Sequence, residues 1–157
     1  MSMRPEGLPE KKREAWATEV VRAVPDAINP SHRIAVVLGV GCGLRQGEVF
    51  GPVTTDIDFD AKEIHVCRQV QLDGNTMFYK FPKDEKACVV PMSASVAAEL
   101  LLHMRTYAPA TIELPWAEAD SEKKQAHALV LTNAAGNSNN FKSWSVRPGG
   151  PRSPRPE

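Results

Sequence analysis

The sequence predicts an α+β domain in which N-terminal helices precede a small three-stranded antiparallel sheet and a further helix. Up to about residue 41, apolar residues recur every three or four positions, as they do on one face of a helix. Over residues 64–72 they alternate with polar residues, which is typical of a strand. The triplet Asp73-Gly74-Asn75 that follows is a hairpin signal. This order of patterns favours helices first, then the sheet, then a helix.

Two helices are expected before the sheet. The first covers 13–24 and is expected to end at Pro25, because proline lacks the amide proton that a helix interior needs. The second covers roughly 31–41 and is capped by Ser31. Its core, IAVVLGV, also fits a buried strand, but the cap and the length favour a helix. The apolar faces of the two helices are formed by Trp16, Val20 and Val24, and by Ile34, Val37, Leu38 and Gly41.

The sheet and the last helix follow a short helical turn over 46–50, which Gly51-Pro52 stops. Strands are expected at 64–72, 76–81 and 88–90, and the segment 56–59 begins the sheet. A helix capped by Ser93 or Ser95 then ends before Pro109. Its apolar residues are Val96, Leu100, Leu101 and Met104.

The remaining segments set the expected domain limits. Residues 1–12 are polar and are expected to form a flexible arm or the remnant of a linker, and 13–146 the domain itself. Within it, 109–127 is expected to be a polar loop. Residues 147–157 read RPGGPRSPRPE, and we expect disorder there, because they offer no apolar surface to offset the entropy of ordering.

Composition narrows the classes of function. The chain has 19 Lys and Arg residues and 19 Asp and Glu residues, so its net charge is zero. Many nucleic-acid-binding proteins instead carry an excess of basic residues over their whole surface. A local basic site remains possible. The three cysteines are widely spaced and show no zinc-site pattern, so we expect reduced thiols and no metal or cofactor. There is no signal peptide or membrane-spanning run, and a cytoplasmic protein is expected.

The stretch LGVGCGLRQGEV, at 38–49, concentrates glycines around one arginine. Such a stretch either cradles a phosphate in its amides or directs the side chain of Arg45. The dinucleotide fingerprint G-x-G-x-x-G is excluded, because position 46 is glutamine and no βαβ unit follows. A Walker loop is excluded too, because no Gly-Lys-Ser/Thr follows. We therefore expect Gly41 and Gly43 to end a helix so that Arg45 points outward.

The order of motifs resembles the tyrosine recombinases, and more narrowly their phage-type integrases. GCGLRQGEV is followed by DIDFDAKEIHVCRQV, then FPKDEKACVVPM, then a helix with LLHM near its end. The resemblance runs from about Trp16 to about Trp144 and implies DNA as partner. It departs from the family at Cys88, where members commonly have an arginine.

The resemblance implies roles for four residues. Arg45 matches the first catalytic arginine, which binds the DNA phosphate with its planar fork of donors. Glu48 matches the acidic position that supports this arginine, although a solvated carboxylate at a helix start is also consistent with the sequence. Lys83 matches the hairpin lysine that protonates the leaving 5′ oxygen, with Lys86 as the alternative. Arg45, Lys83 and Lys86 are thus the implied DNA contacts.

Other family motifs are missing. After position 90 the sequence has no H-x-x-R, and Tyr79 and Tyr107 both come too early to match the nucleophile. We therefore expect a C-terminally truncated catalytic domain, inactive alone in DNA strand cleavage and joining.

An Arg- and Pro-rich tail is what GC-rich DNA encodes in a shifted frame, so sequencing beyond the Trp144 codon would test a frameshift. The alternatives are a DNA-binding or regulatory module, and an enzyme completed by another chain. Missing helices would leave an apolar face open, so self-association is expected.

Overall fold

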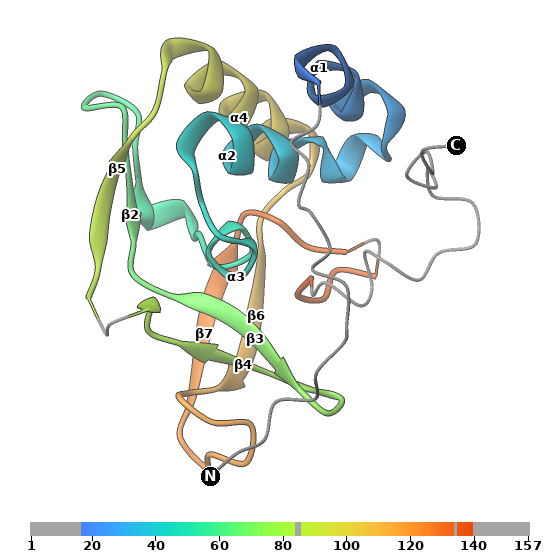
Figure 1. Cartoon of the computed structure of the whole chain (residues 1–157). Coiled ribbons are helices and arrows are strands. Elements are labelled where there is room, and N and C mark those ends of the chain that lie inside the picture. The colour runs from blue at the N-terminus through green and yellow to red at the C-terminus, as the bar shows by residue number, and fades with distance from the viewer. Residues whose placement is uncertain (1–16, 84–85, 134, 140–157) are drawn as a thin grey trace, which may run out of the picture.

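The computed structural model describes residues 17–83, 86–133 and 135–139. Three helices, α1 (Thr18–Ala27), α2 (Arg33–Cys42) and α4 (Ala94–Thr106), lie together at one end of the molecule, and most strands lie toward the other end (Figure 1). Helix α2 packs against both α1 and α4. The one-turn helix α3 (Gln46–Val49) follows α2. The mixture of helices and small antiparallel sheets confirms the predicted α+β class.

The described strands form three small antiparallel sheets. The first has three strands in the order β1-β2-β5 and the other two are hairpins, β3-β4 and β6-β7. The β3-β4 turn lies at Gly74, whose φ of +57° suits glycine and confirms the predicted hairpin. The strands are β1 (Ile57–Asp58), β2 (Glu63–Val66), β3 (Gln69–Asp73), β4 (Thr76–Lys80), β5 (Cys88–Pro91), β6 (Ala110–Pro115) and β7 (Lys124–Leu129).

The prediction of a single strand over 64–72 was wrong. The segment is divided at Cys67 and Arg68 into β2 and β3, which belong to different sheets. The inward positions of the alternation continue across the break. At Arg68, however, the inward side chain is a guanidinium, which pairs with the buried carboxylate of Asp56. We infer that this pairing draws the backbone out of the first sheet.

The polar loop expected over 109–127 was also wrong, since most of this segment is the β6-β7 hairpin. The hairpin is attached to β4 through Tyr79, which is fully buried. The Tyr79 hydroxyl donates to the carbonyl of Ile112 at 2.9 Å, and the Tyr79 carbonyl accepts the amide of Ala117 at 2.7 Å. These bonds bring the hairpin against the β3-β4 pair.

The ends of the helices differ in detail from expectation. Pro25 lies inside the last turn of α1 and does not end it, since a proline there removes only one intrahelical hydrogen bond. Asn29, not Ser31, supplies the cap at the start of the α2 region: its side chain accepts the Ser31 amide at 3.0 Å at the 3₁₀ turn Pro30–His32. Ser93 caps α4 as one of the two predicted alternatives.

The hydrophobic core lies between the helices and the sheets. Apolar side chains from α2, α4 and three of the strands are exposed by 2% or less: Ile34, Leu38, Ile64, Tyr79, Leu100 and Leu129. On the outer surfaces of α2 and α4, Val40 and Leu102 are 65% and 62% exposed. The self-association expected through an open apolar face stays a prediction. None of the described helices has the length and hydropathy that a membrane crossing requires.

The arm 1–12, the start of the first predicted helix, the end of the domain at 146 and the tail 147–157 all lie outside the described residues.

Candidate functional site

The junction between α2 and α3 is built from closely spaced glycines. Gly43 adopts a left-handed conformation, with φ of +68°, and its amide donates to the Gly39 carbonyl at 3.1 Å. Gly41 lies against α4, so that an added Cβ would be 2.7 Å from a methyl group of Val96. The chain therefore leaves α2 sharply, and Arg45 becomes the N-cap residue of α3. The glycines redirect the chain, as expected from the sequence.

Arg45 and Glu48 are joined by two hydrogen bonds. The Arg45 backbone amide donates to Glu48 Oε2 at 2.8 Å, and Nη1 of the guanidinium donates to Glu48 Oε1 at 3.1 Å. The Glu48 side chain is only 8% exposed, whereas that of Arg45 is 65% exposed. This geometry excludes the solvated-carboxylate alternative for Glu48. It leaves most of the guanidinium open to a ligand while one side of it is held in place.

Helix α3 lies unusually close to the start of β3. An added Cβ at Gly47 would lie 3.0 Å from Oε1 of Gln69 and 3.2 Å from the Val70 carbonyl oxygen. At Gly51, just after the helix, it would overlap the Arg68 carbonyl and approach the Gln69 Cα to 3.1 Å. A close backbone approach therefore requires glycine at position 51, and a side chain at position 47 would be a tight fit. The position of Arg45 thus depends on the seating of α3 against β3.

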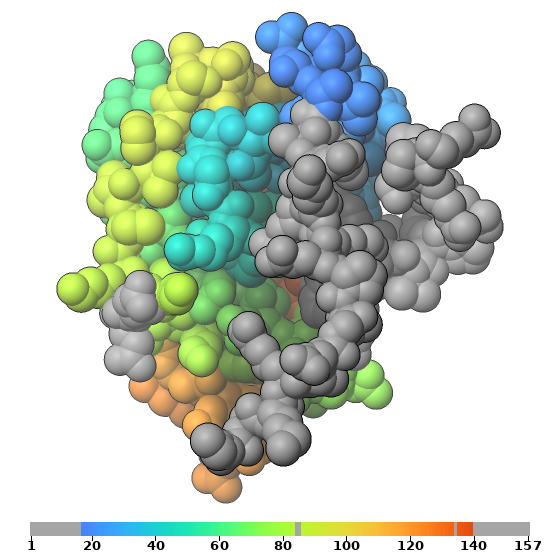
Figure 2. All heavy atoms as spheres, in the orientation of Figure 1, coloured from blue at the N-terminus to red at the C-terminus, as the bar shows by residue number. Residues whose placement is uncertain are grey.

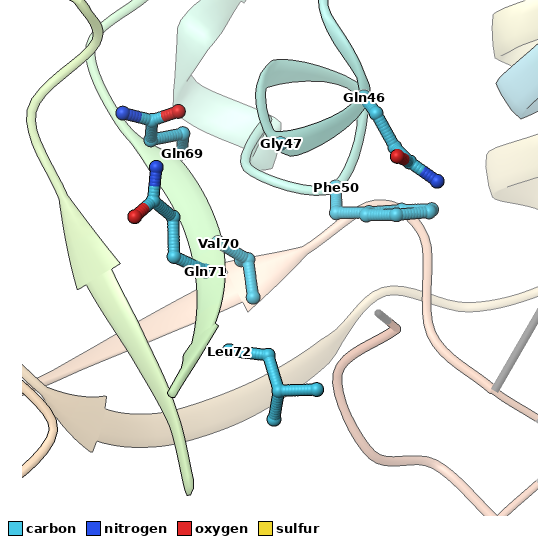
Figure 3. A pocket seen from close by; sticks show the side chains of 7 residues that line it. All are labelled: Gln46, Gly47, Phe50, Gln69, Val70, Gln71 and Leu72. Carbon is cyan, nitrogen blue, oxygen red and sulfur yellow. The ribbon is translucent and has the colours of Figure 1, made fainter. Parts of the chain in front are cut away.

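A groove of about 230 Å³ lies between α3 and β3 (Figure 3). Phe50 contributes apolar surface to it, and the amide side chains of Gln46, Gln69 and Gln71 come from its two walls (Figure 3). One of these amides is already engaged, because Gln69 Nε2 donates to the Phe81 carbonyl at 2.7 Å. The remaining lining residues are Gly47, Val70 and Leu72.

Lys83 and Lys86 lie in the connection between β4 and β5, and both side chains are exposed. Pro82, which precedes Lys83, is buried. The ring of Phe81 packs edge-to-face on the ring of Trp116, with 4.9 Å between the ring centroids. Within the described residues, no hydrogen bond or ion pair joins either lysine to Arg45 or Glu48. In Figure 2 the yellow-green atoms of this connection and the cyan atoms of the α2-α3 segment appear on the same face. The structure therefore brings Arg45 and Glu48 together and leaves the lysines as separate, accessible cations.

A buried ion pair between Asp56 and Arg68 lies beneath the α3 region and was missed by the sequence analysis. Their side chains are 8% and 12% exposed, and Asp56 Oδ2 also accepts the Val53 amide at 3.0 Å. The signal that was overlooked is an arginine at an inward position of the strand alternation. His65 and Arg68 also match H-x-x-R in spacing, but His65 faces solvent on β2 and Arg68 is held by Asp56.

The titratable groups near this ion pair are shifted mainly by burial. Burial raises the pKa of Tyr79 to about 12, and nearby Arg68 opposes the shift. Burial and Arg68 lower the pKa of His127, whose ring meets that of Tyr79 edge-on at 5.0 Å. Tyr79 is therefore a buried phenol whose hydroxyl is hydrogen-bonded in the core. No group of three or more metal-ligating side chains comes together in the part of the chain that the structure describes.

Comparison with known proteins gives one sequence match. The "Tyrosine recombinase XerC-like" protein of Caldanaerobacter subterraneus subsp. tengcongensis is 38% identical over 71 residues, which is 41% of this chain and 18% of that protein. No protein-family model matches the chain.

Solved structures match over most of the chain. The integrase of transposon Tn1549, in complex with transposon right end DNA, has a TM-score of 0.65 at 16% identity and covers 86% of this chain. XerA recombinase has a TM-score of 0.56 at 13% identity and covers 90%. This chain spans 44% and 41% of those two structures, less than half of either. The partial sequence match and the shared fold support the resemblance to tyrosine recombinases and integrases that the order of the motifs indicated.

Proposed function

We propose that this domain binds a DNA phosphate through Arg45, with Lys83 and Lys86 as further contacts, and that the chain does not cleave DNA alone. The observation that carries the proposal is the contrast in exposure between Arg45 and its buried partner Glu48. An arginine held by a buried carboxylate presents its remaining donors in a fixed direction, which suits bidentate recognition of phosphate. The Tn1549 integrase structures contain DNA, which supports this choice of partner.

If another chain supplied the nucleophile, Arg45 would stabilise the negative charge that gathers on the phosphate oxygens during strand transfer. Glu48 orients the guanidinium and does not touch the DNA. Lys83 would then donate a proton to the leaving 5′ oxygen, and Lys86 contacts the backbone nearby. The described tyrosines offer no nucleophile, because Tyr79 is buried and Tyr107 follows the last turn of α4. A chain with these parts alone binds DNA without forming a covalent intermediate.

We expect Arg45→Ala to reduce the salt dependence of DNA binding. The logarithm of the affinity falls with the logarithm of salt concentration by about 0.9 for each phosphate contact on duplex DNA, so one lost contact lowers the slope by about that amount. Fluorescence anisotropy with a nicked 30-mer duplex, titrated at several salt concentrations, measures this slope. Arg22→Ala on α1 removes the same charge at an exposed position and serves as the matched control.

If Arg45→Ala and Arg22→Ala gave equal salt slopes, the proposal that Arg45 binds a DNA phosphate would be wrong.

The same nicked duplex, recovered under denaturing conditions, also tests for a covalent protein-DNA product. Such a product from the wild-type chain would contradict the proposal that it does not cleave DNA alone, and would favour an active enzyme.

A further inference from the structure

The side chain of Gln69 lies between α3, whose N-cap residue is Arg45, and the strand end that leads to Lys83. On one side, Oε1 of Gln69 is near Gly47 of α3, where an added Cβ would lie only 3.0 Å from it. On the other side, Nε2 donates to the Phe81 carbonyl at 2.7 Å. Figure 3 shows the Gln69 amide beside α3, at the edge of the groove. One amide side chain thus contacts both segments.

The β3-β4 ladder ends beside the Gln69 side chain. Gln69 and Lys80 are its last pair, and Arg68 and Phe81 would be the next in the same register. Arg68 is instead bound to the buried carboxylate of Asp56, and the ladder stops. The Phe81 carbonyl lies beyond the last pair and accepts a hydrogen bond from the Gln69 side chain. This bond joins β3 to the segment that follows β4.

The two residues before Lys83 are fixed by their surroundings. The Phe81 carbonyl is held by Gln69 and its ring by Trp116, and Pro82 is buried with a restricted φ. The Lys83 side chain, by contrast, is exposed. The position of its ammonium group relative to Arg45 is therefore set by the backbone just before it. The Gln69 bond joins this backbone to β3, the strand against which α3 packs.

We propose that Gln69 is a positioning residue, which holds the Lys83 segment at a set distance from Arg45 so that both cations meet the same stretch of DNA backbone. This inference rests on the proposed function of Arg45 and Lys83. Gln69 itself does not touch DNA in this scheme. Its loss acts through Lys83, whose ammonium group then samples a larger volume and makes a weaker phosphate contact.

A double-mutant cycle on DNA binding tests this role. Gln69→Met keeps the length of the side chain and removes the donor. We expect it to lower the salt slope of binding toward the value of Lys83→Ala, by up to about 0.9, and to have no further effect in the Lys83→Ala background. Gln71→Met is the matched control, because Gln71 lies on the same strand and lines the same groove without a bond to Phe81. Urea unfolding of each variant verifies that the fold is retained.

The outcomes separate the two proposals. If Lys83→Ala lowers the slope but Gln69→Met binds like Gln71→Met, the positioning role is wrong and the proposed function stands. If Gln69→Met weakens binding equally with and without Lys83, Gln69 acts independently of Lys83 and the inference is also overturned. If neither Arg45→Ala nor Lys83→Ala changes the slope, the proposed phosphate site fails, and the role of Gln69 fails with it.

Discussion

Replacing Gly51 with alanine is expected to destabilise the domain by about 3 kcal/mol or more, the upper end of the cost of overpacking a close contact. The new methyl group would overlap the Arg68 carbonyl oxygen and lie 2.9 Å from the Arg68 carbonyl carbon. Both atoms belong to the backbone, which cannot move aside as a flexible side chain can. The conflict is purely steric, because the φ of Gly51 is not in the left-handed region. Urea denaturation followed by circular dichroism measures the change.

Gly39→Ala is the matched control for Gly51→Ala. Gly39 lies within α2 and an added Cβ would meet nothing within 4 Å. Because alanine favours a helix interior over glycine by about 1 kcal/mol, this variant is expected to be as stable as the wild type or more so. If Gly51→Ala unfolded at the same urea concentration as Gly39→Ala, α3 would not be seated against the start of β3. The dependence of the Arg45 position on that contact would then be wrong.

The Arg45–Glu48 pair shows what could be predicted from the sequence. The two residues are three positions apart, and residues at this spacing meet on one face of a helical turn. The glycines before them indicate a change in chain direction, whatever the rest of the fold is. Such local relations do not depend on distant parts of the chain. The sequence could not show that Glu48 is buried, because its burial depends on elements that pack from elsewhere.

The division of the predicted strand shows why the rest could not be predicted. The alternation continues without interruption from β2 into β3, so periodicity alone gives one strand. We infer that the two strands are separated by the pairing of Arg68 with Asp56, which is 12 positions away and meets it in the interior. No periodic pattern expresses a pairing of this kind. A single charged residue at an inward position was the local sign of it.

The β6-β7 hairpin was missed for a different reason. Ile112, Leu114 and Trp116 alternate with more polar residues, so a strand signal was present. The prolines and acidic residues around it favoured a loop. The partner that stabilises the hairpin, Tyr79, lies more than 30 positions earlier. The contact of Trp116 with Phe81 then links this hairpin to the segment that carries Lys83.

Asp56→Ala is expected to cost about 3–5 kcal/mol of folding free energy, as breaking a buried ion pair does when one charge is left behind. Arg68, whose side chain is 12% exposed in the wild-type structure, would lose its carboxylate partner, and the Val53 amide would lose its acceptor. The comparison is Asp26→Ala, which removes a carboxylate from Arg33 at a site where the Asp26 side chain is 78% exposed. That loss is expected to be below about 1 kcal/mol, because solvent screens exposed pairs. Chemical denaturation of both variants gives the two values.

The double variant Asp56→Ala with Arg68→Met tests the cause of the loss. Once the buried charge is removed as well, the unpaired guanidinium no longer penalises the fold, and most of the lost stability is expected to return. If instead the changes in unfolding free energy of the two substitutions add, the cost of Asp56→Ala comes from the lost Val53 hydrogen bond and from packing. In that case the Asp56–Arg68 pair would not be what separates β2 from β3, and the end of the β3-β4 ladder at Gln69 would need another physical explanation.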